Sequence, residues 1–418
     1  MNPTILMAGL ALLVGILGGL GALVLGYLIN LVDFVSFSHL KGYLSLLGPF
    51  TLPLIGCTGG LLVGLLTYFV AQEAKGRGIP EVINAVEQGG KIRPRVALIK
   101  TLASALTIGT GGSAGREGPI AQIGAALGST VGQLLKLPKQ QLIKLVACGA
   151  GAGIAATFNA PLAGAVFALE VILRRFTLNT FGLVVISSVS GTFVAHLFLG
   201  DVTTFTGVSY SLVSPVELLL YAALGIVAAF VSIFFSRVFY KIEDMFKNIP
   251  RVPVWFLPAL GGIAFGLIGY FLPETLGRGE QIMNQILCGK MDAAGFLALL
   301  CLAKIITTSL TLGSGGSGGV LFPSMFIGVC LGGSFGSVFH SLMPGLTGAS
   351  GAYALVGMGS FFAAANRAPA TAIIMVIEMT YNQEIILPLM LACGVATILA
   401  RTMEKESIHT KKLARNGM

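Results

Sequence analysis

One arginine and one glutamate stand side by side in GTGGSAGREGPIAQIG, residues 109–124 of a chain of 418 residues. Glycines flank the pair, and Pro119 follows it. Proline is common in the first turn of a helix, where backbone amides lack acceptors and the helix dipole is positive. Such a helix start binds anions, and a carboxylate there competes with them. Glu117 is therefore a candidate competitor of an anion bound at this helix start, and a plain Glu117–Arg116 structural pair is the alternative.

The same plan recurs in the second half of the chain. GSGGSGGVLFP (313–323) matches GTGGSAGREGP (109–119) at six of eleven positions, at an offset of 204. RAPATAIIMVIEM (367–379) matches the Ala-Pro and Glu of NAPLAGAVFALEV (159–171) at an offset of 208. Chance similarity between glycine-rich sequences is the alternative, but six matches that include a proline favour a repeat. Two such repeats, interrupted by Gly and Pro, are typical of a transporter with its site at the repeat interface.

Composition indicates the medium in which these segments fold. The chain is 55% hydrophobic and 10% charged, with a mean hydropathy of +0.89, unlike a soluble domain. Apolar runs such as Thr4–Leu31, Tyr43–Val70, Val96–Ile108 and Ile385–Ala400 do not alternate with polar residues, which favours helices over a β-barrel. We therefore predict an all-α membrane protein, in which 57 glycines mark close helix crossings and helix breaks.

The charged and metal-ligating residue types exclude several function classes. The net charge of +9 lies in the short connections and the tail, which is typical of cytoplasmic loops and not of a nucleic-acid-binding face. The six cysteines stand singly, and the four histidines have no metal-ligand spacing. We predict no nucleic-acid partner, no metal and no other cofactor.

Three short strings together resemble a known family. GRGIP (76–80), GREGP (115–119) and GVLFP (319–323), in this order, resemble the anion-coordinating signatures of the CLC chloride channels and transporters. The resemblance runs from about Gly9 to Leu413. It implies a homodimer of tilted and often broken helices in two inverted halves, with a separate anion path in each subunit. It also implies that Glu117 is the gate, whose carboxylate occupies an anion site until it is protonated or displaced.

The resemblance sets the expected domain plan and location. We expect one transmembrane anion-transport domain over 2–413, with repeats over about 2–199 and 214–413, a short basic tail over 414–418 and no soluble regulatory domain. The expected location is a prokaryotic inner membrane, crossed many times, with both termini cytoplasmic. The expected partners are chloride or another small anion, membrane lipid, a second copy of the chain and, in an exchanger, protons.

The anion ligands are expected to be backbone amides at helix starts. The candidate donors are Gly78, Ile79, Gly118, Ile120, Val320 and Leu321. Leu321 stands where the family pattern usually has Phe, a mild change because the backbone N–H binds the anion.

Two departures from the pattern affect the inner end of this site. Arg77 replaces the usual Ser, and we consider three positions for its side chain: turned away, adding positive charge to the pathway, or solvated at the surface. His409, in ESIHTKKLARNG, replaces the Tyr whose hydroxyl closes the site. A neutral imidazole donates one hydrogen bond and a protonated one adds charge, so His409 either lines the pathway or lies on a displaced, exposed tail.

A third departure affects coupling to protons. Many exchangers have two successive glutamates where this chain has Glu170 and Val171, and the second is the internal proton acceptor. Valine cannot carry a proton, so the sequence favours a passive chloride channel. A proton-coupled chloride antiporter remains the alternative, because some exchangers lack this acid. Glu170 and its repeat counterpart Glu378 are expected to be structural, at buried helix ends.

Other classes fit less well. GASG (348–351) resembles the nucleophile motif of intramembrane serine proteases, with Ser350 and His409 as a possible dyad, but Ser350 also suits a helix N-cap. A fluoride exporter is disfavoured because GREGP keeps the chloride-type Pro119. We therefore expect a transport protein and not an enzyme.

Overall fold

The computed structural model describes residues 3–200, 204–415 and 417. The first half of the chain forms α1 (Pro3–Phe34), α2 (Lys41–Leu44), α3 (Thr51–Phe69), α4 (Ile79–Glu87), α5 (Arg95–Gly109), α6 (Glu117–Leu134), α7 (Lys139–Phe158), α8 (Pro161–Phe167) and α9 (Leu178–Leu199). Short 3₁₀ or π segments lie at η1 (Val35–Leu40), η2 (Ser45–Phe50), η3 (Gln72–Ala74) and η4 (Ala168–Leu173). All regular elements that the structure describes in this half are helical, as the composition predicts.

The second half repeats the order. It forms α10 (Glu217–Lys247), α11 (Leu257–Phe271), η5 (Pro273–Thr275), α12 (Glu280–Leu287), α13 (Ala294–Gly313), α14 (Leu321–Leu342), α15 (Ser350–Asn366), α16 (Pro369–Thr380), α17 (Ile386–Met403) and α18 (Thr410–Arg415). Among the described residues, eight helices are long and apolar enough to cross a membrane. Several others are short, so the chain combines complete spans with half-helices, which a bilayer tolerates only where protein or a water-filled cavity surrounds the helix end.

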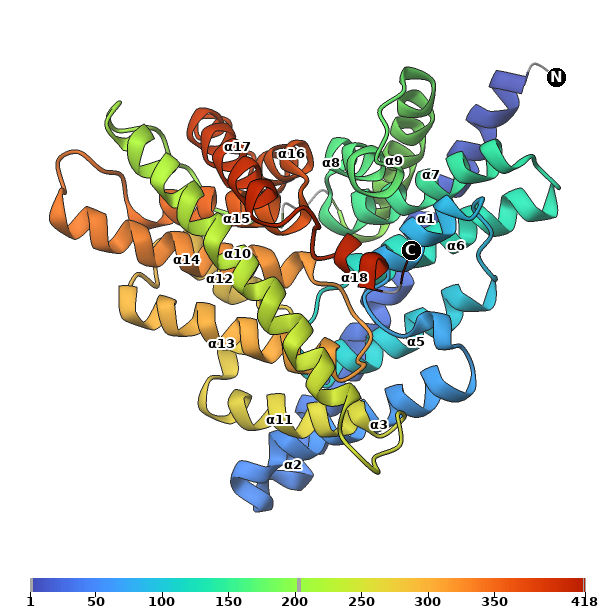
Figure 1. Ribbon diagram of the computed structural model, residues 1–418, viewed down its shortest axis with the longest axis horizontal. Coiled ribbons are helices and arrows are strands. Elements are labelled where there is room, and N and C mark those ends of the chain that lie inside the picture. Colours follow the sequence, from blue (N-terminus) through green and yellow to red (C-terminus); the bar gives the residue numbers. More distant parts are fainter. Residues whose placement is uncertain (1–2, 201–203, 416, 418) are drawn as a thin grey trace.

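The two halves meet along an approximate two-fold axis. Figure 1 shows the first half on the right and the second on the left, with α3 against α11 and α8 beside α16 in the middle. Reciprocal hydrogen bonds identify the axis: the amide of Ser113 donates to Thr311 Oγ1 at 3.1 Å, and that of Ser317 donates to Thr107 Oγ1 at 3.0 Å. Ser317 is the repeat counterpart of Ser113, and Thr311 is that of Thr107, both at the offset of 204. Each serine therefore binds the threonine of the other repeat, which requires a two-fold relation between the repeats.

A second reciprocal pair involves the two carboxylates. Glu170 accepts hydrogen bonds from the amides of Ala370 and Thr371 at the start of α16, at 3.2 and 2.7 Å. Glu378 accepts bonds from the amides of Leu162 and Ala163 at the start of α8, at 3.0 and 2.7 Å. Each carboxylate thus caps a helix start in the other half, which confirms the structural role expected from the sequence.

Glycines allow pairs of helices to cross with their backbones in contact. A Cβ on Gly124 of α6 would lie 2.0 Å from the carbonyl oxygen of Gly149 on α7, and the reverse distance is also 2.0 Å. Gly328 and Gly357 repeat this crossing between α14 and α15, at 2.4 Å in both directions. These crossings hold α6 and α14 so that both helices start near the centre of the molecule.

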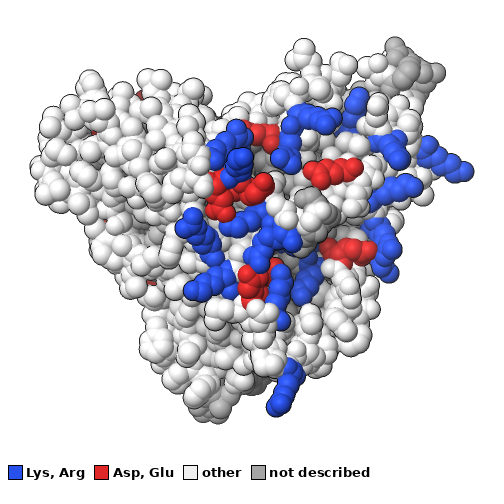
Figure 2. Space-filling view, in the orientation of Figure 1, with Lys and Arg blue, Asp and Glu red and all other residues white. Residues whose placement is uncertain are grey.

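Charged side chains gather on one face. Figure 2 shows Lys and Arg concentrated around the C-terminal helix α18 and over the neighbouring first-half elements, while the left part of this face is almost free of charge. The sides of the molecule carry large exposed apolar residues, among them Phe193 and Leu197 on α9 and Leu387 and Met390 on α17. A protein embedded in a bilayer is expected to carry its charges on a face that contacts water and its exposed apolar side chains on the surface that contacts lipid.

Candidate functional site

The two Gly-rich breaks meet at the two-fold axis. Gly115 and Gly319 exchange backbone hydrogen bonds in a single antiparallel bridge, with N to O distances of 2.9 and 2.7 Å. A Cβ at Gly115 would lie 2.0 Å from the carboxylate of Glu117, and one at Gly319 would lie 2.6 Å from it. A side chain at either position would collide with the Glu117 carboxylate, so the two glycines leave this carboxylate its place between the loops.

Glu117 lies fully buried at the first residue of α6. Its Oε1 accepts a hydrogen bond from the amide of Phe322, in the first turn of α14, at 2.8 Å. Its Oε2 has no hydrogen-bond partner within the described part of the chain. A buried carboxylate that is only partly satisfied is costly, so its place at the end of a second helix indicates a site built for negative charge.

A third helix start adjoins the first two. A Cβ at Gly78, just before α4, would lie 2.2 Å from the carbonyl oxygen of Gly118, so the two backbones touch. Gly78 has a φ of +90°, which glycine adopts without strain. The starts of α4, α6 and α14 thus converge, and their dipoles make this region positive. Pro119 and Pro323 lie in the first turns of α6 and α14, as predicted.

The candidate amide donors divide into two groups. The amide of Gly78 donates to Glu81 Oε2 at 2.8 Å, and that of Ile120 donates to the Arg116 carbonyl at 2.9 Å. The expectation that Gly78 and Ile120 donate to an anion is therefore wrong, because both amides already have acceptors within the protein. Glu81 caps the start of α4, and Ile120 makes a regular helical bond in α6. Ile79, Gly118, Val320 and Leu321 remain at the converging helix starts. Phe322, whose amide binds Glu117, was not among the donors expected from the sequence.

Arg77 turns away from the helix starts. Its guanidinium donates to the Ile408 carbonyl and to the Tyr240 hydroxyl, both at 2.7 Å, and lies 4.7 Å from the ring centroid of Phe239. Tyr240 donates its own hydroxyl hydrogen to the same carbonyl of Ile408 at 2.9 Å. Of the three positions considered for this side chain, the structure shows the one that is turned away from the candidate anion site. The Arg77 guanidinium clamps the segment before α18 in place instead of donating to the helix starts.

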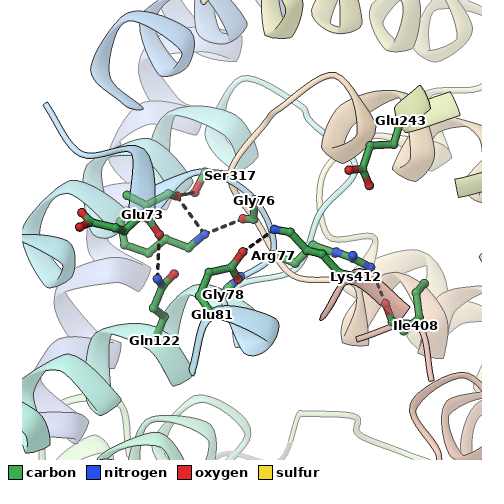
Figure 3. A network of polar contacts seen from close by, with 12 residues as sticks. Glu73, Gly76, Arg77, Gly78, Glu81, Gln122, Glu243, Ser317, Ile408 and Lys412 are labelled. Carbon is green, nitrogen blue, oxygen red and sulfur yellow. Dashed lines mark hydrogen bonds and ion pairs between the residues drawn. The ribbon is translucent and has the colours of Figure 1, made fainter. Parts of the chain in front are cut away.

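The clamp places His409 inside the protein. The amide of Ile408 donates to the Ala365 carbonyl at 3.1 Å, and the His409 side chain is only 1% exposed, so the displaced and exposed tail is wrong. Lys412 forms an ion pair with Glu81 on α4, as Figure 3 shows beside the Arg77 contact with Ile408. Burial first, and then the charge of Arg77, lower the pKa of His409 to about 3. The imidazole is therefore neutral at ordinary pH.

A buried lysine supports the loop before α4. Lys100 on α5 is fully buried, and its Nζ donates to the carbonyls of Ala74 and Gly76 at 3.2 and 2.6 Å. Lys100 was not among the site residues expected from the sequence, although a lone lysine in an apolar run was a usable signal. Lys304, at the repeat offset of 204, binds the carbonyls of Thr275 and Gly277 at 2.9 and 3.0 Å.

Arg116 points away from the carboxylate beside it. Its guanidinium donates to the Thr157 carbonyl at 3.1 Å and pairs with Glu280 of the second half at 3.5 Å. A plain structural pair between Arg116 and Glu117 is therefore wrong. Arg116 instead ties the start of α6 to its neighbours.

A cavity of about 810 Å³ opens between the halves beside the tail. Its walls come from η4, α17, the start of α16 and the segment that leads into α18. Val171 and His409 both line it. Two of the positions that depart from the family pattern therefore share one cavity.

Ser350 does not form a dyad with His409. The helix α15 separates them: Ser350 is its first residue, while Ile408 contacts its other end, so about 24 Å of helix lies between. Neither ring nitrogen of His409 has a hydrogen-bond partner among the described residues. The N-cap of α15 is Ala349, so the N-cap role expected for Ser350 is also wrong. The protease alternative has no geometric support.

Comparison with known proteins agrees with this architecture. The model of the family described as voltage gated chloride channel matches residues 59–401. A putative chloride channel protein ClcB-like from Ralstonia nicotianae is 33% identical over 87% of this chain and 85% of its own length. The H(+)/Cl(-) exchange transporter ClcA from Vibrio cholerae serotype O1 is 33% identical over 97% of this chain and 88% of its own.

Solved structures agree as well. The crystal structure of a slow cyanobacterial Cl-/H+ antiporter superposes with a TM-score of 0.87 and 27% identity, over 100% of this chain and 98% of that one. A CLC-type fluoride/proton antiporter, 24% identical with a TM-score of 0.79 over 96% of both chains, shares the fold. With its helix starts meeting at the axis and, among the described residues, eight helices long and apolar enough to cross a membrane, this chain is a multi-pass membrane protein that belongs to the CLC family of anion channels and transporters.

Proposed function

We propose that this protein exchanges chloride for protons across a membrane, with Glu117 as the gate. The observation that carries the proposal is the position of the Glu117 carboxylate. It occupies the point where the α6 and α14 starts meet and takes the Phe322 amide for itself. An anion that enters must displace this charge, and protonation of the carboxylate removes it. One group thus links the movement of anions to that of protons.

Similarity to exchangers supports coupling over passive conduction. Relatives named as H(+)/Cl(-) exchange transporters reach 33% identity over nearly the whole chain, and the cyanobacterial antiporter aligns over all of it. The loss of an acid at position 171 favoured a channel on sequence grounds, and the ClcB-like relative carries a channel name. The passive channel is therefore the second candidate.

The proposal includes an orientation and an assembly. We place the charged face around α18 at the cytoplasm, because basic residues are retained on that side of a membrane. The cavity beside His409 then opens to the cytoplasm, in a prokaryotic inner membrane. Two copies form a homodimer with one anion path each, and their contact covers exposed apolar side chains such as Phe193 and Leu387.

We propose that Ile79, Gly118, Val320 and Leu321 offer amides to the anion, and that His409 lies at its inner end. Arg77 acts through the tail and not as a direct ligand.

Flux measurements with simultaneous pH recording test the proposal. Purified protein in liposomes is given an outward chloride gradient, with a potassium ionophore to clamp the voltage, and external chloride and pH are followed together. An exchanger drives protons into the vesicles, against their own gradient, in a fixed ratio to the chloride released. Chloride release without proton movement identifies the passive channel.

A further inference from the structure

The cavity beside the tail contains a titratable side chain with unmet hydrogen-bonding capacity. His409 lines this cavity together with Val171, and its side chain is 1% exposed. Its backbone is held by the Ser407 hydroxyl, which accepts from the His409 amide at 3.3 Å, and by the Arg77 clamp on Ile408. Both ring nitrogens lack a partner within the described residues. Buried imidazole nitrogens are normally bonded, so this pair points to partners that arrive from the pathway and the cavity.

We propose that His409 accepts protons from the cytoplasm for delivery to Glu117, the task that Val171 cannot perform. The inference rests on the proposed exchange function and assigns its missing internal acceptor. A neutral imidazole is suited to it because one ring nitrogen donates to a bound anion while the other takes a proton.

The other titratable groups on the cavity wall are less suited than His409 to accept protons from the cytoplasm. The cavity-lining acids and cations are Glu170, Glu406, Arg174, Arg175, Arg367, Arg401 and Lys405. Both carboxylate oxygens of Glu170 already accept amides of α16. The arginine and lysine side chains are hydrogen-bond donors with no acceptor atom that could take up a proton. Glu406 is the remaining competitor, and it is a test case below.

The charges that face His409 from the neighbouring elements link its proton to the anion. Arg77 disfavours the imidazolium, and Glu81 of α4 favours it, although Glu81 is paired with Lys412. Burial is the largest influence and keeps the empty site neutral. An anion bound against the ring stabilises the imidazolium and so offsets the effects of burial and of Arg77, which both favour the neutral ring. The bound anion therefore raises the pKa of His409 toward cytoplasmic pH. By reciprocity, the proton strengthens anion binding by the same factor.

The proton balance of the step is simple. A hydronium ion from the cytoplasm gives its proton, through the water of the cavity, to the free ring nitrogen of neutral His409; water remains, and an imidazolium forms beside the anion. The imidazolium then releases a proton, through water in the pathway, to the carboxylate of Glu117. The neutral carboxyl group releases the Phe322 amide, and the imidazole returns to its starting state.

Coupled flux in liposomes gives the first test. We expect His409→Gln and His409→Tyr to lower the ratio of protons to chloride at least about tenfold, whatever their effect on the chloride rate. Glu406→Gln is the matched control and keeps the wild-type ratio. Adding Val171→Glu to His409→Tyr restores coupling. If wild type moves no protons, the exchange function fails; if wild type couples and His409→Gln couples equally well, only the role of His409 fails. Loss of coupling in Glu406→Gln alone would assign the acceptor to Glu406.

Calorimetry gives a second test that keeps His409 intact. Glu117→Gln removes the other group that links protons to chloride. Chloride is titrated into this variant at pH 6, in two buffers of different ionisation enthalpy. We expect proton uptake with each chloride bound, and none in Glu117→Gln combined with His409→Gln. Chloride binding to Glu117→Gln with no proton uptake would overturn the inference even if the His409 variants abolish transport.

Discussion

The two Gly-Arg-Gly loops of this protein share a support and differ in their surroundings. In both, a fully buried lysine donates to two carbonyls: Lys100 supports Gly76–Gly78, and Lys304 supports Gly277–Gly279. In the first loop Arg77 clamps the tail, while in the second Arg278 pairs with Glu280 at 3.4 Å beside a pocket of about 480 Å³. The repeat thus supplies the scaffold, and function depends on the side chains that the copies do not share.

The crossing at the axis shows the same asymmetry. Glu117 and its repeat counterpart Leu321 both occupy the first residue of a half-helix, but only the first carries a charge. Carboxylates at both positions would place two like charges where the two helix starts meet, and these charges would repel each other. The single carboxylate of Glu117 lies between the positive ends of α6 and α14 and accepts only one hydrogen bond from the described residues of α14, so it can leave this position.

Removal of the Glu117 charge tests this asymmetry with the largest expected effect. Glu117→Gln keeps the shape but cannot ionise, so we expect proton transport to fall to background while chloride flux persists without its pH dependence. Paired chloride and pH recordings in liposomes measure both. Glu280→Gln, a neighbouring carboxylate that pairs with Arg116 and Arg278, is the control and keeps coupled transport. Unchanged pH dependence in Glu117→Gln would refute the gate.

The two loop arginines provide the next test. Arg77→Gln removes charged hydrogen bonds to Ile408 and Tyr240, worth about 1.5–3 kcal/mol each, so the tail loosens and His409 loses its place. We expect chloride affinity, measured calorimetrically, to fall about tenfold, or about 1.4 kcal/mol. Arg278→Gln should change it less than about twofold. Equal losses in both variants would mean that the loops do not differ in function.

The two buried lysines should have similar effects on stability. Lys100→Met and Lys304→Met each leave two buried carbonyls without a donor, which costs at least about 2 kcal/mol. We expect thermal unfolding in detergent to shift down by a similar amount in both. Only Lys100→Met should also weaken chloride binding, because its loop adjoins the helix starts. If Lys304→Met weakens binding as much, the second loop also serves the site.

The reciprocal carboxylates provide a smaller, symmetric test. Glu170→Gln and Glu378→Gln keep an acceptor oxygen but lose the charge that favours a helix start, which costs about 1 kcal/mol. We expect nearly equal losses of stability by thermal denaturation, with coupling retained. A loss of proton coupling in Glu170→Gln alone would show that this acid carries protons.

The ion pair that docks the tail has the smallest expected effect. Burial would raise the pKa of Glu81, but Lys412 and Lys100 outweigh it and hold the pKa at about 2. The pair therefore stabilises docking above the ordinary value of 4.5 and loses this contribution as the pH falls toward 2. The protection factors of the tail amides, which are exchange rates corrected for the intrinsic effect of pH, should fall in wild type as the pH is lowered from 5.5 to 3.5. Lys412→Met should show lower protection at pH 5.5 and a smaller fall.

The sequence predicted the half-helices because proline, glycine and the repeat offset act locally. It also predicted that Glu117 lies at a helix start, and the structure places this residue, fully buried, at the first position of α6; its role as the gate stays a proposal. It could not predict the clamp at Arg77, because the acceptors on Tyr240 and Ile408 are 163 and 331 residues away along the chain. The occupied amides of Gly78 and Ile120 depend on bonds to Glu81 and Arg116 that a motif does not reveal. Contacts distant in sequence decide which of several plausible donors are free.

In the proposed function, the starts of α6 and α14 jointly bind an anion at the place where Glu117 competes with it. Crystals of Glu117→Gln grown in bromide, with anomalous diffraction recorded at the bromine edge, test this directly. The account predicts an anomalous peak within hydrogen-bonding distance of the amides of Val320 and Leu321, at or beside the position of the wild-type carboxylate. Bromide bound elsewhere, with no peak at the meeting of the two helices, would contradict it.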